Sequence, residues 1–160
     1  MYLLRDFKSS DASVFASLNL QWISETFTLE SQDRAQLTDP TNNIINAGGH
    51  IVIAEIKGLV VGTGALLPVK PPIPDHRKWM ELIKMTTAPL FRGHGIGKAV
   101  LLSLLKKAEN NNIQAIWLET NSKLTRAVKL YENNGFTPIK PDKFWPSLYS
   151  RCDRQLVYFF

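Results

Sequence analysis

The stretch Arg92-Gly93-His94-Gly95-Ile96-Gly97-Lys98 decides the fold, because three alternate glycines stand where the hydrophobic pattern changes. Before it, residues 79–87 alternate with a period of two, which predicts a β-strand. After it, apolar residues recur every four positions over residues 96–108, which predicts an amphipathic helix. Backbone N–H groups at the start of a helix carry about half a positive charge, so we expect this turn to bind an anion such as phosphate.

The turn differs from two common phosphate-binding loops. A Walker A loop requires glycine where Arg92 stands and serine or threonine where Ala99 stands. The dinucleotide-binding fingerprint, counted from Gly93 and Gly95, requires its third glycine at Lys98. A tight strand-to-helix connection that needs only small residues stays open as a structural explanation of the glycines.

The segments before the turn predict an antiparallel sheet. Residues 51–56 and 59–67 are apolar, β-branched runs separated by Lys57-Gly58, which is the spacing of a tight hairpin. The two glycines in the second run either weaken that strand or mark a bulge. Residues 68–75 contain four prolines and predict a stiff loop. On the strand that follows we expect two faces, with Met80, Leu82 and Lys84 on one side and Glu81, Ile83 and Met85 on the other.

The segments after the turn predict a strand, a second helix and closing strands. Residues 113–120 are rich in β-prone side chains. Tyr131 lies on the apolar face of a helix that stops at Gly135, and Asn121 or Ser122 is the expected N-cap. Further strands are expected from Phe136 onward and over residues 157–159.

The N-terminal part predicts a strand followed by helices. We expect the first helix to turn Val14, Leu18 and Trp22 toward the core. The strand and the three helices are expected over residues 2–5, 10–24, 30–37 and 40–46. This order of elements predicts an α/β (α+β) domain built around one sheet.

Composition limits the class of protein. The chain has 160 residues, 44% of them hydrophobic, which predicts a single domain spanning residues 1–160. Its one cysteine, Cys152, excludes an internal disulfide and a multi-cysteine metal site, and favours a cytoplasmic location. No secretory signal is recognisable, and no apolar run approaches the ~20 residues of a membrane helix, so we expect no membrane contact.

Net charge points to an anionic partner. The formal charge is +5, and residues 92–130 carry seven basic and two acidic residues, so this segment alone accounts for the excess. No recognition-helix pattern or aromatic-basic RNA signature accompanies the charge, so no nucleic acid is expected. His50, His76 and His94 lack metal-ligand spacing, so no metal is expected either.

Together these segments resemble the GNAT superfamily of N-acyltransferases. Arg92-x-x-Gly95-x-Gly97 is similar to the coenzyme A pyrophosphate motif of that family. Matching segments follow the family's order over residues 50–140: Glu81 to Met85, Ala88-Pro89, Leu118 to Asn121, Ala127, Leu130 to Glu132 and Gly135-Phe136. The resemblance implies a single GNAT-like domain with a central, mixed and mostly antiparallel sheet, flanked by helices and splayed open between the strands that end near Thr87 and Thr120.

The resemblance also implies an acetyl-CoA-dependent N-acetyltransferase and its cofactor contacts. The backbone of Met85, Thr86 and Thr87 would pair with the pantetheine arm of acetyl-CoA, much as a peptide adds to a sheet edge. Asn121 would face the same arm, unless it caps the helix instead. The pyrophosphate contacts are implied for Arg92, Gly93, His94, Gly95, Ile96, Gly97 and Lys98.

Two side chains are candidates for the chemistry. In several relatives a glutamate at the position of Glu81 acts as general base, and burial beside Ile83 and Met85 would raise the pKa of its carboxyl. The alternative is a solvated or ion-paired edge carboxylate. Tyr131 stands where the family places the tyrosine that protonates the coenzyme A thiolate, and it can also serve as a packed core residue.

The acceptor is expected to be a primary amine of a small molecule or a protein. Residues 20–45 hold four acidic residues and one arginine, a net −3 that suits a cationic amine. Phe144, Trp145 and Tyr149 are either core residues or the lining of an acceptor pocket. The alternative function is a catalytically silent acyl-CoA-binding regulatory module. The acceptor, the acyl-chain preference and the choice between monomer and homodimer stay open.

Overall fold

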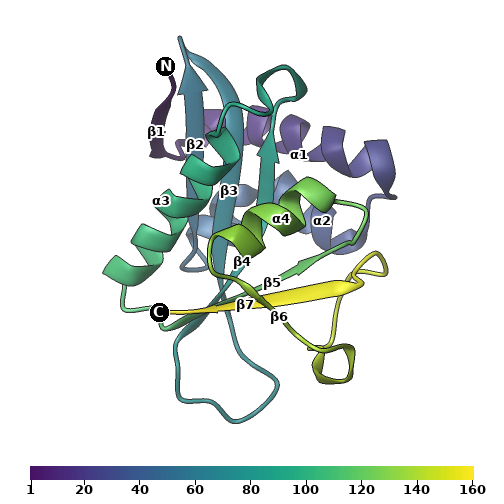
Figure 1. Ribbon diagram of the computed structural model, residues 1–160. Helices are drawn as coiled ribbons and strands as arrows, with labels where there is room; N and C mark the ends of the chain where they lie inside the picture. The colour runs from purple at the N-terminus through teal and green to yellow at the C-terminus, as the bar shows by residue number, and fades with distance from the viewer.

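The computed structural model describes residues 1–160 and contains one seven-stranded sheet with helices on both faces (Figure 1). The strand order is β1-β2-β3-β4-β5-β7-β6, and every neighbouring pair is antiparallel except β4 and β5. The single-domain α/β fold with a mixed, mostly antiparallel sheet is therefore confirmed.

The strands are β1 (Leu3–Asp6), β2 (His50–Ile56), β3 (Leu59–Val69), β4 (Trp79–Thr87), β5 (Ala115–Thr120), β6 (Thr137–Pro138) and β7 (Arg154–Phe159). The helices are α1 (Ala12–Thr26), α2 (Ser31–Thr38), α3 (Ile96–Asn110) and α4 (Thr125–Asn133). Short helical turns complete the chain: η1 (Ser9–Asp11), η2 (Thr41–Ile45), η3 (Pro89–Phe91) and η4 (Pro141–Lys143).

Two hydrophobic clusters hold the layers together. Alternation along β2 shows how they form, because Val52 and Ala54 pack with α3 and α4 on one face while Ile51 and Ile53 pack with α1 and α2 on the other. The pair of helices in front of the sheet in Figure 1 is α3 and α4, and α1 and α2 lie behind it. The central strands β2 to β5 are therefore buried on both sides along most of their length, whereas β1 and β6 at the edges have no buried residue.

The buried face of α1 lies one residue away from the predicted one. We expected Val14, Leu18 and Trp22 to face the core, but the buried residues are Phe15, Asn19 and Ile23. Asn19 hid this face in the sequence because it is polar. Its amide nitrogen donates to the Phe15 carbonyl at 2.9 Å and to the Thr63 hydroxyl at 3.2 Å, so the amide is satisfied inside the core.

β4 contains a bulge that changes its alternation. Thr63 of β3 pairs with Thr86, whereas Ala65 pairs with Ile83, so β4 has one residue more than β3 over this interval. Lys84 lies in the extra stretch and has a φ of 55°, in the left-handed region. The bulge that we expected in β3 thus forms opposite its glycines, in β4, and a second irregularity interrupts the β2–β3 pairing.

Because of this bulge, the predicted faces of β4 are wrong for Lys84 and Met85. Lys84 was expected beside Met80 and Leu82, but its side chain reaches Asp33 of α2, on the opposite face. Met85 was expected beside Glu81, but it packs in the cluster with α3. One inserted residue therefore sends the strand's side chains to the opposite faces from position 84 onward.

The sheet opens between β4 and β5, as expected. These parallel strands pair over three positions only, where Trp79, Met80 and Glu81 lie opposite Ala115, Ile116 and Trp117. Beyond them β4 continues to Thr87 and β5 to Thr120 without pairing with each other. The free ends of the two strands form the two sides of a gap.

Three further expectations concern where strands and helices begin and end. β3 runs through Pro68 to Val69, so the proline-rich loop begins later than predicted. The N-cap of α4 is Leu124, and the expectation of a cap at Asn121 or Ser122 is wrong. The stop at Gly135 is confirmed, with a φ of 96°. No helix of the structure has both the length and the apolar character required to cross a bilayer.

Candidate active site

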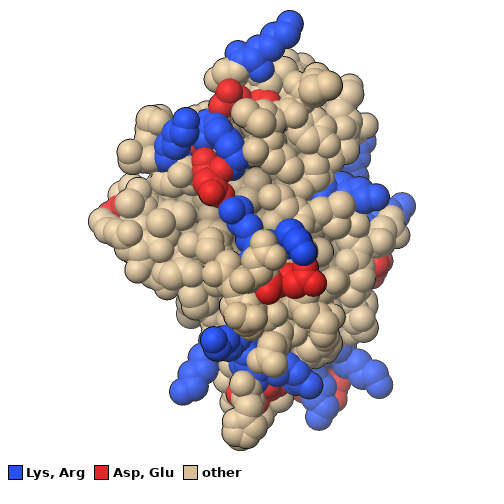
Figure 2. All heavy atoms as spheres, turned by 90° about the vertical axis from the view of Figure 1, so that its left-hand side faces the viewer, with Lys and Arg blue, Asp and Glu red and all other residues tan.

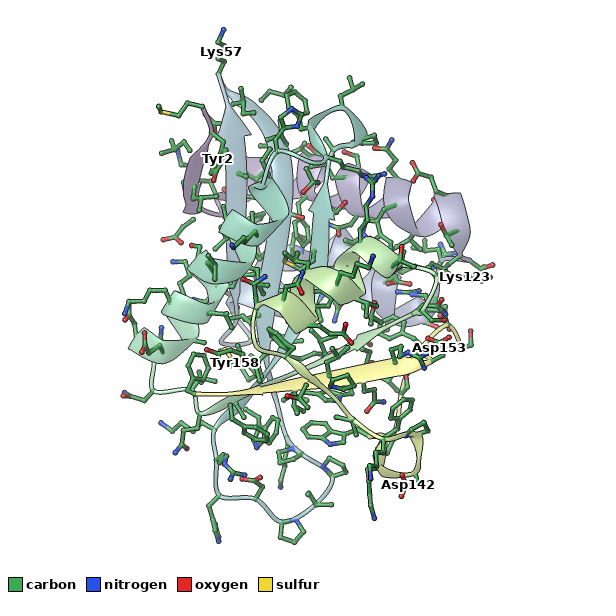
Figure 3. The ribbon with its side chains drawn as sticks, in the orientation of Figure 1. Tyr2, Lys57, Lys123, Asp142, Asp153 and Tyr158 are labelled. Atoms are coloured by element: carbon green, nitrogen blue, oxygen red, sulfur yellow. The ribbon has the colours of Figure 1, made fainter.

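The gap between β4 and β5 opens into a cleft of about 1020 Å³. Its walls come from α1, β4, the glycine turn, β5, α4 and the C-terminal segment before β7. In Figure 3, Lys123 and Asp153 mark the end of the cleft where β5 stops and β7 begins. The volume lies at the upper end of the range for ligand sites, so the cleft has room for a large cofactor.

The glycine turn presents a row of unbonded amides to this cleft. Gly93 and Gly95 have φ values of 81° and 77°, which L-residues other than glycine rarely adopt. The first backbone N–H to bond is that of Ala99, which donates to the Gly95 carbonyl at 3.0 Å. None of residues 93–98 donates a backbone hydrogen bond within the protein. Six consecutive amides at the start of α3 are thus free for an anionic ligand.

The β4 edge offers a second binding element. Thr86 and Thr87 pair with β3 on one side, but beyond Glu81 no strand pairs with β4 on the other. Met85, Thr86 and Thr87 all line the cleft there. An extended chain that carries amides can add to such an edge.

Only part of the basic segment faces the cleft. Four of its seven cationic side chains line the cleft, and these are Arg92, Lys98, Lys123 and Arg126. Lys106 and Lys107 instead pair with Glu109 and Asp6. Figure 2 shows basic and acidic side chains in separate small groups on its face. The positive charge at the cleft is therefore local, at the turn and at the start of α4.

The side chains of Asn121 and His94 are already hydrogen-bonded within the protein, unlike the free groups around them in the predicted site. Asn121 lines the cleft, but its amide nitrogen donates to the Arg151 carbonyl at 2.6 Å and its side-chain oxygen accepts from the Lys123 amide at 2.9 Å. The His94 ring turns back, with Nδ1 2.9 Å from the Arg92 carbonyl oxygen, and does not line the cleft. At His94 only the backbone amide is free to contact a ligand.

Glu81 lies at the point where β4 and β5 part. Its backbone makes the last pair of the ladder, with Trp117, and its side chain lines the cleft. Its carboxylate forms no ion pair with a Lys or Arg side chain, so the alternative that Glu81 is an ion-paired edge carboxylate is not supported. The nearby Lys84 pairs with Asp33 instead. Burial and the nearby Glu119 carboxylate raise the pKa of Glu81 to about 8, and Lys84 lowers it only partly. A carboxyl with this pKa can accept a proton near neutral pH.

Sequence reasoning missed a second carboxylate, Glu119. It lies two residues after Trp117, so it shares a face of the sheet with Glu81. Its Oε1 is buried and has no hydrogen-bond partner, and burial raises the pKa of its carboxyl. Strand alternation counted from Trp117, together with parallel pairing of the two strands, was the available signal.

Tyr131 reaches the cleft from the opposite wall. Its side chain is 7% exposed and its ring packs against Phe136 at 5.7 Å between centroids. The hydroxyl makes no hydrogen bond within the protein, and burial raises the pKa of the phenol. The residue is therefore packed in the core and also faces the cleft.

The acidic excess of residues 20–45 is compensated inside the protein. Asp33 accepts from Lys84 at 2.9 Å and from both terminal nitrogens of Arg151 at 2.7 Å. Glu30 also pairs with Arg151, and Glu25 lies 3.9 Å from Arg92. Asp33 and Glu30 are therefore not free to bind a cationic acceptor, so the net charge of the segment overstates the acidity that is available for one.

Cys152 lies on the wall of the cleft without signs of a nucleophile. Burial and Glu119 raise the pKa of its thiol to about 11, which keeps it protonated near neutral pH. Elsewhere, no three or more His, Cys, Asp or Glu side chains are grouped so that they could hold a metal ion.

Comparisons with known proteins agree with this geometry. A family model described as the acetyltransferase (GNAT) family matches residues 16–136. The chain is 35% identical over 115 residues to rat N-acetyltransferase family 8 member 2, which covers 72% of this chain and 50% of the relative. It thus spans about half the length of that curated relative.

Solved structures share the fold along the whole chain. A GNAT-family acetyltransferase from Staphylococcus aureus Mu50 superposes with a TM-score of 0.86 at 24% identity and covers 99% of both chains. A predicted acetyltransferase from Clostridium acetobutylicum, solved with acetyl-CoA, superposes with a TM-score of 0.73 at 27% identity and covers 93% of this chain and 96% of its own.

Proposed function

We propose, from the premise that this chain belongs to the GNAT family of acetyltransferases, that it transfers an acetyl group from acetyl-CoA to a primary amine. The observation that carries the proposal is the row of free amides at residues 93–98 beside the free edge of β4. A pyrophosphate suits the first and an amide-bearing pantetheine arm suits the second. The C. acetobutylicum structure, which holds acetyl-CoA, supports the same cosubstrate here.

In this proposal the cofactor lies along the turn and β4. The amides of residues 93–98 hold the pyrophosphate, with Arg92 and Lys98 adding positive charge. The backbone of Met85, Thr86 and Thr87 pairs with the pantetheine arm. Asn121 contributes at the wall of the cleft rather than through a free amide group, because both ends of its amide are already bonded.

Glu81 acts as general base. An alkyl amine is protonated near neutral pH and must lose a proton before its nitrogen can attack. Glu81 takes that proton directly or through a water molecule, and its raised pKa suits the task. The neutral nitrogen then forms a bond to the thioester carbonyl carbon, and the carbon–sulfur bond breaks. The attacking nitrogen releases its second proton to solvent, which balances the proton delivered to the departing sulfur.

Tyr131 acts on the departing sulfur. Its hydroxyl has no partner in the protein, so it is free to donate to a thiolate in the cleft. Because burial raises the pKa of the phenol, the residue stays protonated until negative charge develops on sulfur. It then stabilises that charge by a hydrogen bond. Because the raised pKa of the phenol opposes leaving a phenolate behind, its proton passes to sulfur as the phenol oxygen regains a proton from solvent.

The test measures thiol release from acetyl-CoA against a library of amines, in wild type, Glu81→Gln and Tyr131→Phe, with coenzyme A affinity measured in parallel. Loss of either group is expected to lower kcat by about 10²- to 10⁴-fold while coenzyme A still binds. Tight coenzyme A binding without turnover on any amine would instead identify a silent acyl-CoA-binding module.

A further inference from the structure

A second pocket adjoins the cleft on the face of the sheet that carries α2. Its volume is about 260 Å³, which is below the range of drug-sized ligand sites. Glu81, Glu119 and Tyr149 line both the pocket and the main cleft, so the two spaces meet at the carboxylates. A molecule in this pocket can therefore present one end to Glu81 while the rest of it lies away from the glycine turn.

The pocket has rigid aromatic walls. Trp117 and Trp145 stack with their ring centroids 4.7 Å apart and an interplanar angle of 15°. Gln155 fixes both residues, because its side-chain oxygen accepts from the Trp117 indole at 3.1 Å and from the Trp145 backbone amide at 2.7 Å. Its amide nitrogen donates to the Trp145 carbonyl at 2.8 Å. The segment that carries Trp145 is thus held in place before any ligand binds.

The polar end of the pocket is acidic. Glu119 Oε1 is buried and lacks a hydrogen-bond partner, and such a group is costly unless something completes its bonding. Glu81 lies on the same face of the sheet and forms no ion pair. An amino group placed between these carboxylates would supply the missing donor.

The remaining charges near the pocket favour a ligand with a single cationic centre. Lys70 also lines the pocket and is exposed, so it adds positive charge that disfavours a second cation. Asp33 is bonded to Lys84 and Arg151, and Glu30 to Arg151. Leu148 and the tryptophans supply an apolar lining beyond the carboxylates. A polyamine or a lysine chain would bring a second charge or a long polar tail to this lining without a partner.

We propose that this pocket binds the body of the acceptor, and that the acceptor is a small primary amine with one flat apolar group, of the arylalkylamine kind. Its amino group lies between Glu81 and Glu119, and its ring lies against Trp145 and Leu148. This assignment rests on the proposed acetyl transfer and adds the class of acceptor to it.

The experiment compares kcat/KM for 2-phenylethylamine, ethylamine and putrescine at saturating acetyl-CoA. We expect 2-phenylethylamine to exceed both other amines by at least about tenfold, because ring burial contributes binding that they lack. Trp145→Ala is expected to remove most of this advantage, measured within that variant as the ratio of kcat/KM for 2-phenylethylamine to kcat/KM for ethylamine. Phe144→Ala is the matched control, since Phe144 is adjacent in sequence and lines neither space.

Further measurements keep the outcomes distinct. Trp145→Phe retains an aromatic ring, so it is expected to lose less of the preference for 2-phenylethylamine than Trp145→Ala. Coenzyme A affinity reports whether each variant is folded. Transfer to amines without a preference for 2-phenylethylamine, or a preference that Trp145→Ala leaves intact, overturns the pocket assignment but leaves the acetyltransferase proposal standing. Absence of transfer to any amine, with coenzyme A bound, overturns both.

Discussion

The two halves of the cleft are built by different means. The proposed cofactor half consists of residues 85–98, one continuous segment that offers free backbone amides and a free strand edge. The acceptor half brings together α2, the middle of β4, β5 and the segment before β7, and it relies on side chains. A site made of backbone groups depends on glycine positions, whereas a site made of side chains depends on which partners meet across the fold.

The largest expected effect tests whether the acceptor half depends on its buried charges. Asp33→Asn leaves Lys84 and Arg151 without their carboxylate, and Lys84 is buried, so the free energy of unfolding should fall by about 3–5 kcal/mol. Asp39→Asn is the control, because Asp39 bonds only to the exposed Asn42. Denaturant unfolding measures both. Equal stabilities of the two variants would contradict the proposed role of the pair.

The pairing of Asp33 with Lys84 and Arg151 also predicts how the stability of the protein responds to acid. The pKa of Asp33 is lowered to about 2, so its contribution to stability is complete above its unfolded value near ~3.9 and is lost as the pH falls toward 2. Wild type should therefore lose stability more steeply than Asp33→Asn over this interval.

The next effect concerns the pH dependence of turnover. Because the base must be deprotonated and the pKa of Glu81 is about 8, kcat should fall below that value with a slope that approaches tenfold per pH unit, or roughly fiftyfold between pH 8 and 6. The measurement uses kcat because the amine is already bound at saturation. The protonation of the free amine in solution therefore affects kcat less than it affects kcat/KM. Glu81→Gln should remove the break near pH 8, and a wild-type kcat that stays level from pH 6 to 8 would rule out this base.

A smaller effect tests the backbone character of the cofactor half. Gly95→Ala places a side chain at a φ of 77°, which costs about 1–2 kcal/mol, so coenzyme A should bind roughly 5- to 30-fold more weakly if the turn relaxes to avoid the strain. Gly58→Ala is the matched control. Gly58 has a φ of 82° in the β2–β3 hairpin, so its substitution should lower stability without changing coenzyme A affinity. Titration calorimetry gives the affinities, and equal losses in both variants would contradict a local effect.

The smallest effect tests whether coenzyme A affinity depends on the basic residues beside the cleft or on the overall charge of the basic segment. Lys106 is exposed, pairs with Glu109 and does not line the cleft. Lys106→Gln should change stability by less than about 1 kcal/mol and leave coenzyme A affinity unchanged. Lys98→Gln should weaken coenzyme A binding, since Lys98 lines the cleft beside the free amides. Equal affinities in these two variants would mean that location within the basic segment does not matter.

The same contrast explains what could be predicted from the sequence. The glycine turn, the amphipathic helix after it and the strand before it are local patterns, and the structure confirms all three elements. Their site residues are adjacent along the chain, so a motif can reveal them. The splay between β4 and β5 followed from the family resemblance rather than from any local signal.

The acceptor half could not be predicted in the same way. Glu119 was missed because its significance arises only when β5 lies parallel to β4, beside Glu81. The ion pairs of Asp33 join it to Lys84, 51 residues away, and to Arg151, 118 residues away, so the charge count of residues 20–45 gave the wrong impression of free acidity. Strict alternation along β4 also failed, because a bulge at Lys84 leaves no clear mark in the sequence.

That bulge has a consequence for how this site can change. The two ends of β4 have different surroundings: Glu81, before Lys84, lines the acceptor pocket, whereas Met85, Thr86 and Thr87, after it, line only the cleft on the proposed cofactor side. In the proposed reaction one strand therefore serves two substrates in succession. Selection for a new acceptor can act on residues that line only the acceptor pocket, such as Trp117, Trp145 and Leu148, without altering the backbone edge proposed to receive acetyl-CoA.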